Sequence, residues 1–137
     1  AKVFDLLAAL LEWNDLTLST PAAACISAKD QEALQSLKHF LLQNYSAQVD
    51  LQRLAQMCYM SKSKLTYLFR MLYGTTIYEF ILACRIDRAK DLLADREKKI
   101  SEIAALVGYE RQSSFSAAFH QKTGITPNEF RRQFWNK

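Results

Sequence analysis

The chain has 137 residues, half of them hydrophobic and 23% charged, with a net charge of +4 at pH 7. This length is enough for one domain, or for a domain of about 100 residues with an extra segment. Because no apolar run approaches the roughly 18 residues that span a bilayer and the N-terminus lacks a signal-peptide pattern, we expect a cytoplasmic protein without membrane contact.

Helix breakers are scarce in this sequence, which contains only three glycines and two prolines. Gly74, Gly108 and Gly124 each lie where an amphipathic run ends or turns, as expected of tight turns and helix C-terminal caps. This distribution predicts an all-α fold.

The chemically reactive side chains show no catalytic or metal-binding spacing. Cys25, Cys58 and Cys84 form no Cys-x-x-Cys pair, and free thiols in a reducing cytosol fit this spacing better than disulfides or zinc. His39 and His120 are isolated from any nucleophile or metal-ligand partner. We therefore expect no cofactor, no metal and no enzymatic activity.

Residues 1–27 are predicted to be the end of a preceding regulatory or dimerisation domain and its linker. Residues 2–13 are predicted to place apolar side chains on one helical stripe, which is the last helix of that domain, an oligomerisation helix, or a helix that packs on the rest of this chain. Residues 14–27 have no helical periodicity and read as a linker. The stripe comprises Val3, Leu6, Leu7, Leu10 and Leu11.

The remaining residues, 28–137, are predicted to form one domain that begins with a capped helix. Ser27 and Asp30 are suited to cap the N-terminus of that helix. Its side chains at helical spacing predict a face packed against the rest of the domain. This buried stripe comprises Leu34, Leu37, Phe40, Leu41 and Tyr45.

Two stretches of the chain repeat one pattern of two short helices joined by a turn, at an offset of 49 or 50 residues. We assign them to helix-turn-helix units within residues 28–75 and 95–137. Each is followed by Thr-x-x-Glu, a reciprocal helix cap. The matched pairs are Leu51 and Ile100, Leu54 and Ile103, Ala55 and Ala104, Leu65 and Phe115, Phe69 and Phe119, and Gly74 and Gly124.

A longer helix over residues 76–94 is predicted to connect the units. At 1.5 Å per residue it spans about 28 Å, close to the ~34 Å repeat of the DNA major groove. Arg85 and Arg88 lie on this connector among acidic residues, where helical charge pairs explain them without any nucleic acid.

The predicted outward faces of the second helices carry groups that can read DNA bases. A helix in the major groove needs side chains that hydrogen-bond base edges or touch a thymine methyl, flanked by cations for phosphates. The base-reading candidates are Ser63, Thr66, Tyr67, Arg70, Gln112, Ser113, Ser116 and Ala117. The phosphate candidates are Ser61, Lys62, Lys64, Arg111, His120 and Lys122.

The distribution of charge agrees with this interpretation. Residues 1–59 carry four basic and six acidic side chains, a net −2, whereas residues 60–137 carry fourteen basic and eight acidic side chains, a net +6. A basic region suits polyanions such as nucleic acid, although many solvated surfaces have a similar charge.

From about Asp30 to Arg132 the chain resembles the DNA-binding domain of the AraC/XylS family of bacterial transcription regulators. The resemblance is carried by Ser61-x-x-x-Leu65-x-x-x-Phe69, by Arg85-x-x-Arg88-Ala89-x-x-Leu92-Leu93, and by Gly124-x-Thr126-Pro127-x-Glu129-Phe130-Arg131. It implies seven helices and two recognition helices in adjacent segments of the major groove. It also implies an N-terminal domain that binds a small-molecule effector or forms a homodimer.

Two positions depart from the family pattern. Tyr59 replaces the glycine usual in the first turn, so we expect a strained or differently shaped turn there. Ala117 replaces a longer polar side chain, so we expect less discrimination by hydrogen bonding in the second unit.

Two other classes of function remain open from the sequence. One is a helical interaction module that contacts RNA polymerase or another partner through the stripe of residues 2–13. The other is DNA-alkyl-transfer repair, which requires an activated thiolate that no local motif supplies.

Overall fold

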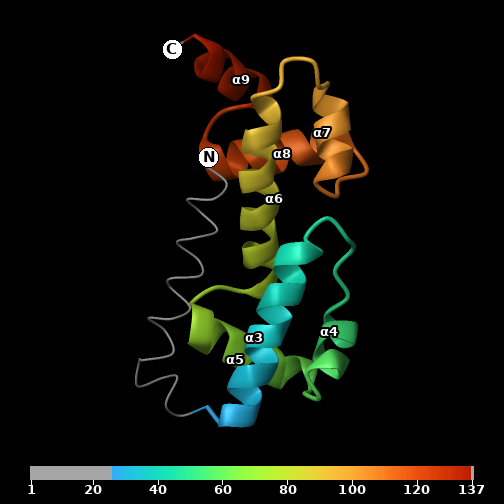
Figure 1. Ribbon diagram of the computed structural model, residues 1–137, viewed down its shortest axis with the longest axis vertical. Helices are drawn as coiled ribbons and strands as arrows, with labels where there is room; N and C mark the ends of the chain where they lie inside the picture. Colours follow the sequence, from blue (N-terminus) through green and yellow to red (C-terminus); the bar gives the residue numbers. More distant parts are fainter. Residues whose placement is uncertain (1–25, 137) are drawn as a thin grey trace.

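The computed structural model describes residues 26–136, which form seven helices and no strand (Figure 1). The predicted all-α fold is confirmed. The stripe of residues 2–13 and Cys25 lie outside the described residues. Within the described range, no helix is both long enough and apolar enough to cross a bilayer. The helices are α3 (Ala28–Gln43), α4 (Leu51–Met57), α5 (Lys62–Tyr73), α6 (Ile77–Leu93), α7 (Ile100–Leu106), α8 (Gln112–Thr123) and α9 (Pro127–Trp135).

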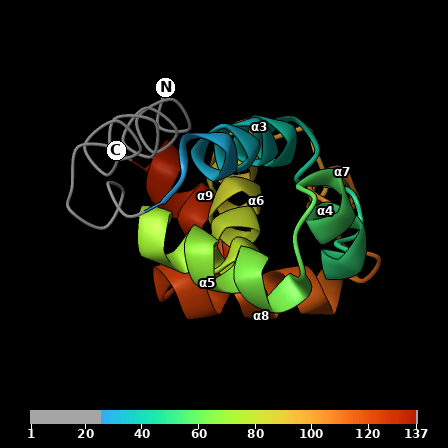
Figure 2. The same cartoon turned by 90° about the horizontal axis from the view of Figure 1, so that it is seen from below.

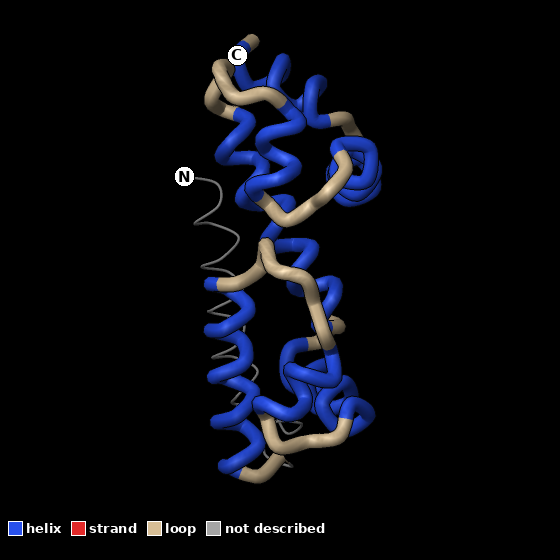
Figure 3. The backbone as a smooth tube through the Cα atoms, turned by 90° about the vertical axis from the view of Figure 1, so that its right-hand side faces the viewer, coloured by secondary structure: helices blue, strands red, loops and turns tan. Residues whose placement is uncertain are grey.

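Helix α6 joins two separate hydrophobic cores. Its N-terminal half, through Cys84, packs in the first core, and its C-terminal half, from Ile86, packs in the second. Helices α3, α4 and α5 surround one half and α7, α8 and α9 the other, so the two units stand end to end along the molecule (Figures 1 and 3). The 17 residues of α6 correspond to about 25 Å of helix, as the connector prediction requires.

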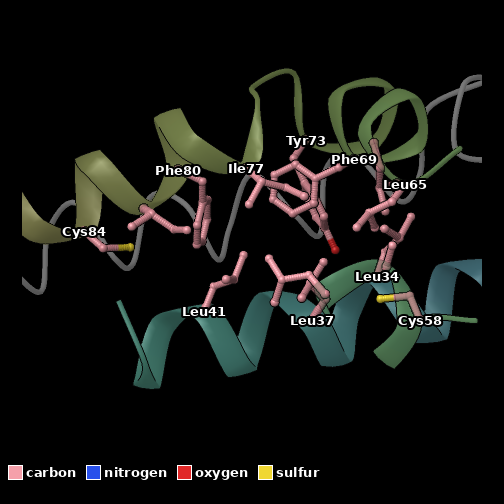
Figure 4. Packing of buried hydrophobic residues seen from close by; sticks show 14 of the residues in the cluster. Leu34, Leu37, Leu41, Cys58, Leu65, Phe69, Tyr73, Ile77, Phe80 and Cys84 are labelled. Carbon is pink, nitrogen blue, oxygen red and sulfur yellow. The ribbon is translucent and has the colours of Figure 1, made fainter. Parts of the chain in front are cut away.

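The first core lies between α3 and the α5–α6 pair. Leu34, Leu37 and Leu41 of α3 point toward the side chains of α5 and α6 (Figure 4). Phe69 is fully buried and packs edge-on against Tyr73 and Phe80, with ring centroids 4.8 and 5.9 Å apart. The three leucines confirm the predicted stripe of α3. Phe40 is exposed, so it lies outside the buried face that Leu37 and Leu41 share.

The second core repeats this arrangement, again around a buried pair of aromatic side chains on one helix. Phe119, at the position equivalent to Phe69, has no exposed surface and lies 5.8 and 5.7 Å from Phe115 and Phe130. Ile103 and Val107 of the α7 region are also fully buried. The predicted inward residues of the second motif therefore form its core.

Side-chain caps fix most helix starts. Asp50 accepts hydrogen bonds from the backbone N–H groups of Gln52 and Arg53, as predicted. At the start of α9, Thr126 and Glu129 form the complete reciprocal cap that the Thr-x-x-Glu pattern predicts. Such bonds satisfy amide groups that have no partner within the helix, and so define where each helix begins.

Candidate nucleic-acid interface

Helix α5 buries one face and leaves the opposite face exposed. Leu65, Phe69 and Leu72 have no exposed surface. The side chain of Ser61 accepts a hydrogen bond of 3.1 Å from the backbone N–H of Lys64, which fixes the start of the helix. As a result, all four base-reading candidates of this helix are exposed, and Tyr67 shows 63% of its surface. They are Ser63, Thr66, Tyr67 and Arg70.

Helix α8 also buries one face and exposes the opposite one. Phe115 and Phe119 are its buried residues. Gln112, Ser113 and Ala117 are exposed, whereas Ser116 is half-buried. In contrast to α5, no side chain caps the start of α8 at Arg111. The N–H groups of its first turn therefore have no side-chain acceptor and can donate to an anion.

The two helices lie on the same side of the molecule. In the end-on view of Figure 2, α5 and α8 run along one side of the molecule and α3 lies along the other. Both pack against α6, which holds them at different heights on the long axis (Figure 1). Two exposed helix faces that point the same way along an elongated molecule can meet one extended ligand.

An open groove borders the exposed face of α5. Leu51 of α4 and Met71 of α5 contribute apolar side chains, and the remaining lining residues also come from α5. The lining brings five sequence-predicted candidates together on one surface. They are Lys62, Ser63, Thr66, Tyr67 and Arg70.

The phosphate candidates differ in whether their side chains are exposed or already interact with other residues of the protein. Lys62, Arg111, His120 and Lys122 are exposed. The ammonium group of Lys64, however, lies 3.2 Å from the carboxylate of Asp30. The hydroxyl of Ser61 serves as the helix cap, although its own hydrogen stays available as a donor.

The sequence did not indicate that the carboxylate of Glu79 lies near this surface. The carboxyl pKa of Glu79 is lowered first by a 2.8 Å hydrogen bond from the Thr75 hydroxyl and then by the Thr76 backbone N–H. Positive charges on Arg70 and Lys122 lower it further. Glu79 is thus an anion close to one cation from α5 and one from α8. The sequence indicated only its role as a helix cap.

The prediction that charge pairs explain both arginines of α6 is confirmed for Arg88 but wrong for Arg85. Arg88 pairs with Asp91 at 3.8 Å. Arg85 instead donates hydrogen bonds to the backbone carbonyls of Tyr45 and Ala47, at 2.7 and 3.0 Å. The sequence did not indicate these partners, because they lie about 40 residues away and are main-chain atoms.

The two described thiols are poorly suited to nucleophilic chemistry. Burial, aided by the negative charge of Asp87, raises the pKa of the Cys84 thiol to about 12. Burial also raises the pKa of Cys58. Because the thiolate is the nucleophile, a raised pKa favours the less reactive protonated form of both side chains near neutral pH.

Comparison with known proteins agrees with this geometry. Residues 54–133 match the model of a family described as a helix-turn-helix domain. The chain is 32% identical over 106 residues to the probable transcriptional regulator LumQ of Photobacterium leiognathi, covering 74% of this chain and 43% of that protein. It is 33% identical over 105 residues to the transcriptional activator RhaR of Yersinia pseudotuberculosis, covering 77% and 36%.

A solved structure from Chromobacterium violaceum, a transcriptional regulator with an AraC-type DNA-binding domain, has the same fold. It superposes with a TM-score of 0.67 at 27% identity and covers 78% of this chain and 96% of that chain. The chain thus spans less than half the length of the two curated relatives but nearly all of this solved domain.

Proposed function

Because the chain belongs to the AraC family and carries its helix-turn-helix DNA-binding domain, we propose that α5 and α8 enter adjacent major-groove segments of one DNA duplex. The observation that supports this proposal most strongly is that both helices bury one face and expose the other on the same side of the molecule. A rigid α6 of about 25 Å separates them. One protein then reads two neighbouring half-sites.

Base recognition is assigned to the exposed residues of the two helices. Arg70 can donate two hydrogen bonds to the O6 and N7 of guanine, and Gln112 can pair with the N7 and amino group of adenine. Tyr67 and Ala117 offer apolar contact to a thymine methyl. The shorter polar side chains give single hydrogen bonds, and this group consists of Ser63, Thr66, Ser113 and Ser116.

Phosphate contacts are assigned to the cations and donors at the margins of these helices. The uncapped start of α8 offers backbone N–H groups to a phosphate beside Arg111. Lys62, His120 and Lys122 are exposed around the same surface. Lys64 must leave Asp30 to take part, and Ser61 can donate its hydroxyl hydrogen while it caps α5.

For the full-length protein we propose a cytoplasmic transcription regulator. Relatives more than twice as long as the matched region leave room for an effector-binding or dimerising part ahead of residue 28. Contact with RNA polymerase is a further proposed interaction. Residues 1–27 are the proposed end of that preceding part, with helix-turn-helix units over 28–75 and 95–137.

The proposal is tested by selecting bound duplexes from a random DNA pool and footprinting the selected sites. We expect protection of two major-groove segments about one helical turn apart and an affinity that falls steeply with salt. Equal affinity for all sequences would exclude specific recognition. Protection of a single segment would exclude docking of both helices.

Two variants separate base contacts from phosphate contacts. Gln112→Ala should cost about 1–3 kcal/mol of binding free energy at one base pair. Lys62→Ala should weaken binding to all sequences alike and make the dependence on salt shallower. If both variants lower the affinity for every duplex equally, the assignment of Gln112 to base recognition is wrong.

A further inference from the structure

The two helix-turn-helix units meet at a seam beside the middle of α6. Apart from α6 itself, no helix of the first unit packs extensively on a helix of the second within the described residues. At this seam the loop between α3 and α4, residues 44–50, lies against the turn between α7 and α8. These contacts therefore decide how firmly the units are held relative to each other.

Arg85 occupies this seam and touches both units. Its Nε donates to the carbonyl of Tyr45 at 2.7 Å and its Nη2 to the carbonyl of Ala47 at 3.0 Å. The guanidinium carbon lies 5.1 Å from the ring centroid of Tyr109, in the turn of the second unit. Arg85 also stands between Cys84, which packs in the first core, and Ile86, which packs in the second.

The backbones of the two units come into close contact at the same place. A Cβ atom added to Gly108 would lie 2.4 Å from the carbonyl oxygen of Ser46, so the turn of the second unit lies directly against the loop of the first. Since the Arg85 hydrogen bonds hold the residues on either side of Ser46, the arginine determines where this loop sits.

Arg131 shows what such an arginine does inside one unit. It donates to the carbonyls of Leu93, Asp95 and Lys98, at 3.2, 3.1 and 2.7 Å, and so holds the loop before α7. Arg85 holds the equivalent loop before α4 in the same manner. The difference is that Arg85 also contacts an aromatic ring of the other unit.

We propose that Arg85 is a positioning residue that fixes α5 relative to α8, and thereby makes the protein selective for the spacing between its two DNA half-sites. This inference depends on the proposed function. When one of two rigidly joined units is bound, the other has a high effective concentration at a half-site of matching spacing and a low one at any other spacing. With a flexible joint, the effective concentration depends much less on the spacing.

The first test compares Arg85→Met, which keeps the aliphatic stem and removes the guanidinium, with Arg88→Met on the exposed side of the same helix. Duplexes carry the selected site with its natural spacing, one base pair more or one base pair less. We expect the wild type and Arg88→Met to lose about tenfold in affinity at either altered spacing, and Arg85→Met to vary by less than about threefold.

A duplex with one half-site separates positioning from a direct DNA contact. Arg85→Met should bind this half-site like the wild type, because α5 and α8 are unchanged. Retained spacing selectivity, or an equal loss of affinity for half-site and full site, overturns the proposal. Should Arg85→Met fail to fold by circular dichroism, Tyr109→Leu makes the same test, since it removes the aromatic ring that Arg85 contacts and keeps an apolar side chain beside Phe115.

A measurement without DNA distinguishes this inference from the proposed function. Spin labels at Ser36→Cys on α3 and Ser101→Cys on α7, with Cys25 replaced by Ser, report the distance between the units. We expect one narrow distance distribution for the wild type and Arg88→Met, and a broad one for Arg85→Met. Equal widths overturn the role of Arg85, whereas a wild-type protein that binds no duplex overturns the proposed function.

Discussion

Equivalent positions in the two helix-turn-helix turns hold Tyr59 and Gly108, and both have a left-handed backbone, with φ of 56° and 101°. Tyr59 is 90% exposed, so its side chain gains no packing in return for this conformation. Gly108 lies against Ser46, where no side chain would fit. The first turn thus tolerates a strained residue at an open surface, whereas the second needs glycine because it contacts the other unit.

The largest expected effects compare the equivalent core residues Phe69 and Phe119. Each is fully buried between two aromatic rings of its own unit, so replacement by alanine should cost about 3–5 kcal/mol of unfolding free energy. Urea unfolding followed by circular dichroism measures this cost, and hydrogen exchange shows which unit opens. If Phe69→Ala exposes α7 and α8 as fully as α4 and α5, the two cores do not unfold as separate units.

Gly108→Ala tests the contact between the units. The added Cβ would lie 2.4 Å from a backbone oxygen, in a left-handed conformation, so we expect a loss of about 2–3 kcal/mol in unfolding free energy. Gly124→Ala is the matched control, since its φ is 82° but no atom lies within 4 Å. The control should cost about 1 kcal/mol, from backbone strain alone. Equal losses for both variants would contradict the close approach.

Much of this architecture follows from local sequence signals. Buried stripes at helical spacing predicted the cores, and Asp50, Ser61 and Thr126 predicted where helices start, because a cap and its helix are neighbours in sequence. The exposed faces of α5 and α8 followed from their buried faces.

The features that the sequence did not predict depend on contacts between distant segments. Arg85 bonds to main-chain carbonyls, which every residue possesses, so no side-chain pattern identifies the partner. Phe40 has the spacing of a core residue, but its surface depends on how α3 rotates against α6. The charges around Glu79 come from α5 and α8, which lie near this carboxylate only in the folded protein.

Helices α5 and α8 also differ at their starts, because the Ser61 side chain caps α5 with a hydrogen bond whereas no side chain at Arg111 caps α8. Ser61→Ala should cost about 1 kcal/mol of unfolding free energy. Arg111→Ala should change that free energy by less than about 0.5 kcal/mol while weakening DNA binding. Thermal unfolding and titration with duplex measure the two effects. A stability loss for Arg111→Ala as large as that for Ser61→Ala would show an equivalent cap.

Replacing Tyr59 by glycine makes the first turn like the second. Glycine removes the left-handed strain but gives the unfolded chain more freedom, so we expect a net stabilisation of about 0.5–1 kcal/mol. Tyr67→Gly is unsuitable as a control because it lies within a helix, and Tyr59→Ala serves better, since it keeps the strain. Chemical unfolding should show a higher unfolding free energy for Tyr59→Gly than for Tyr59→Ala and for the wild type. Greater stability of the wild type would indicate that the exposed ring has a packing partner.

The smallest effect concerns the caps of α6 and α9, where Thr75 stands at the position of Ile125. Its hydroxyl hydrogen-bonds Glu79 and lowers the pKa of that carboxyl from its ordinary value of 4.5. A lowered pKa in the folded state means that the contribution to stability is present above about pH 4.5 and is lost as the pH falls through the folded value. Thr75→Val should therefore destabilise the protein slightly at pH 7 and not at all in strong acid.

Stability of Thr75→Val and wild type, measured by urea unfolding between pH 7 and the lowest pH at which both fold, checks this sign. Because Glu79 is fully exposed, the difference should shrink in high salt, as it does for surface charges. A difference that grows toward acid would mean that the hydroxyl stabilises the protonated carboxyl. In that case the hydroxyl of Thr75 would contribute to the cap of α6 through a hydrogen bond to the neutral carboxyl and not through one to the carboxylate.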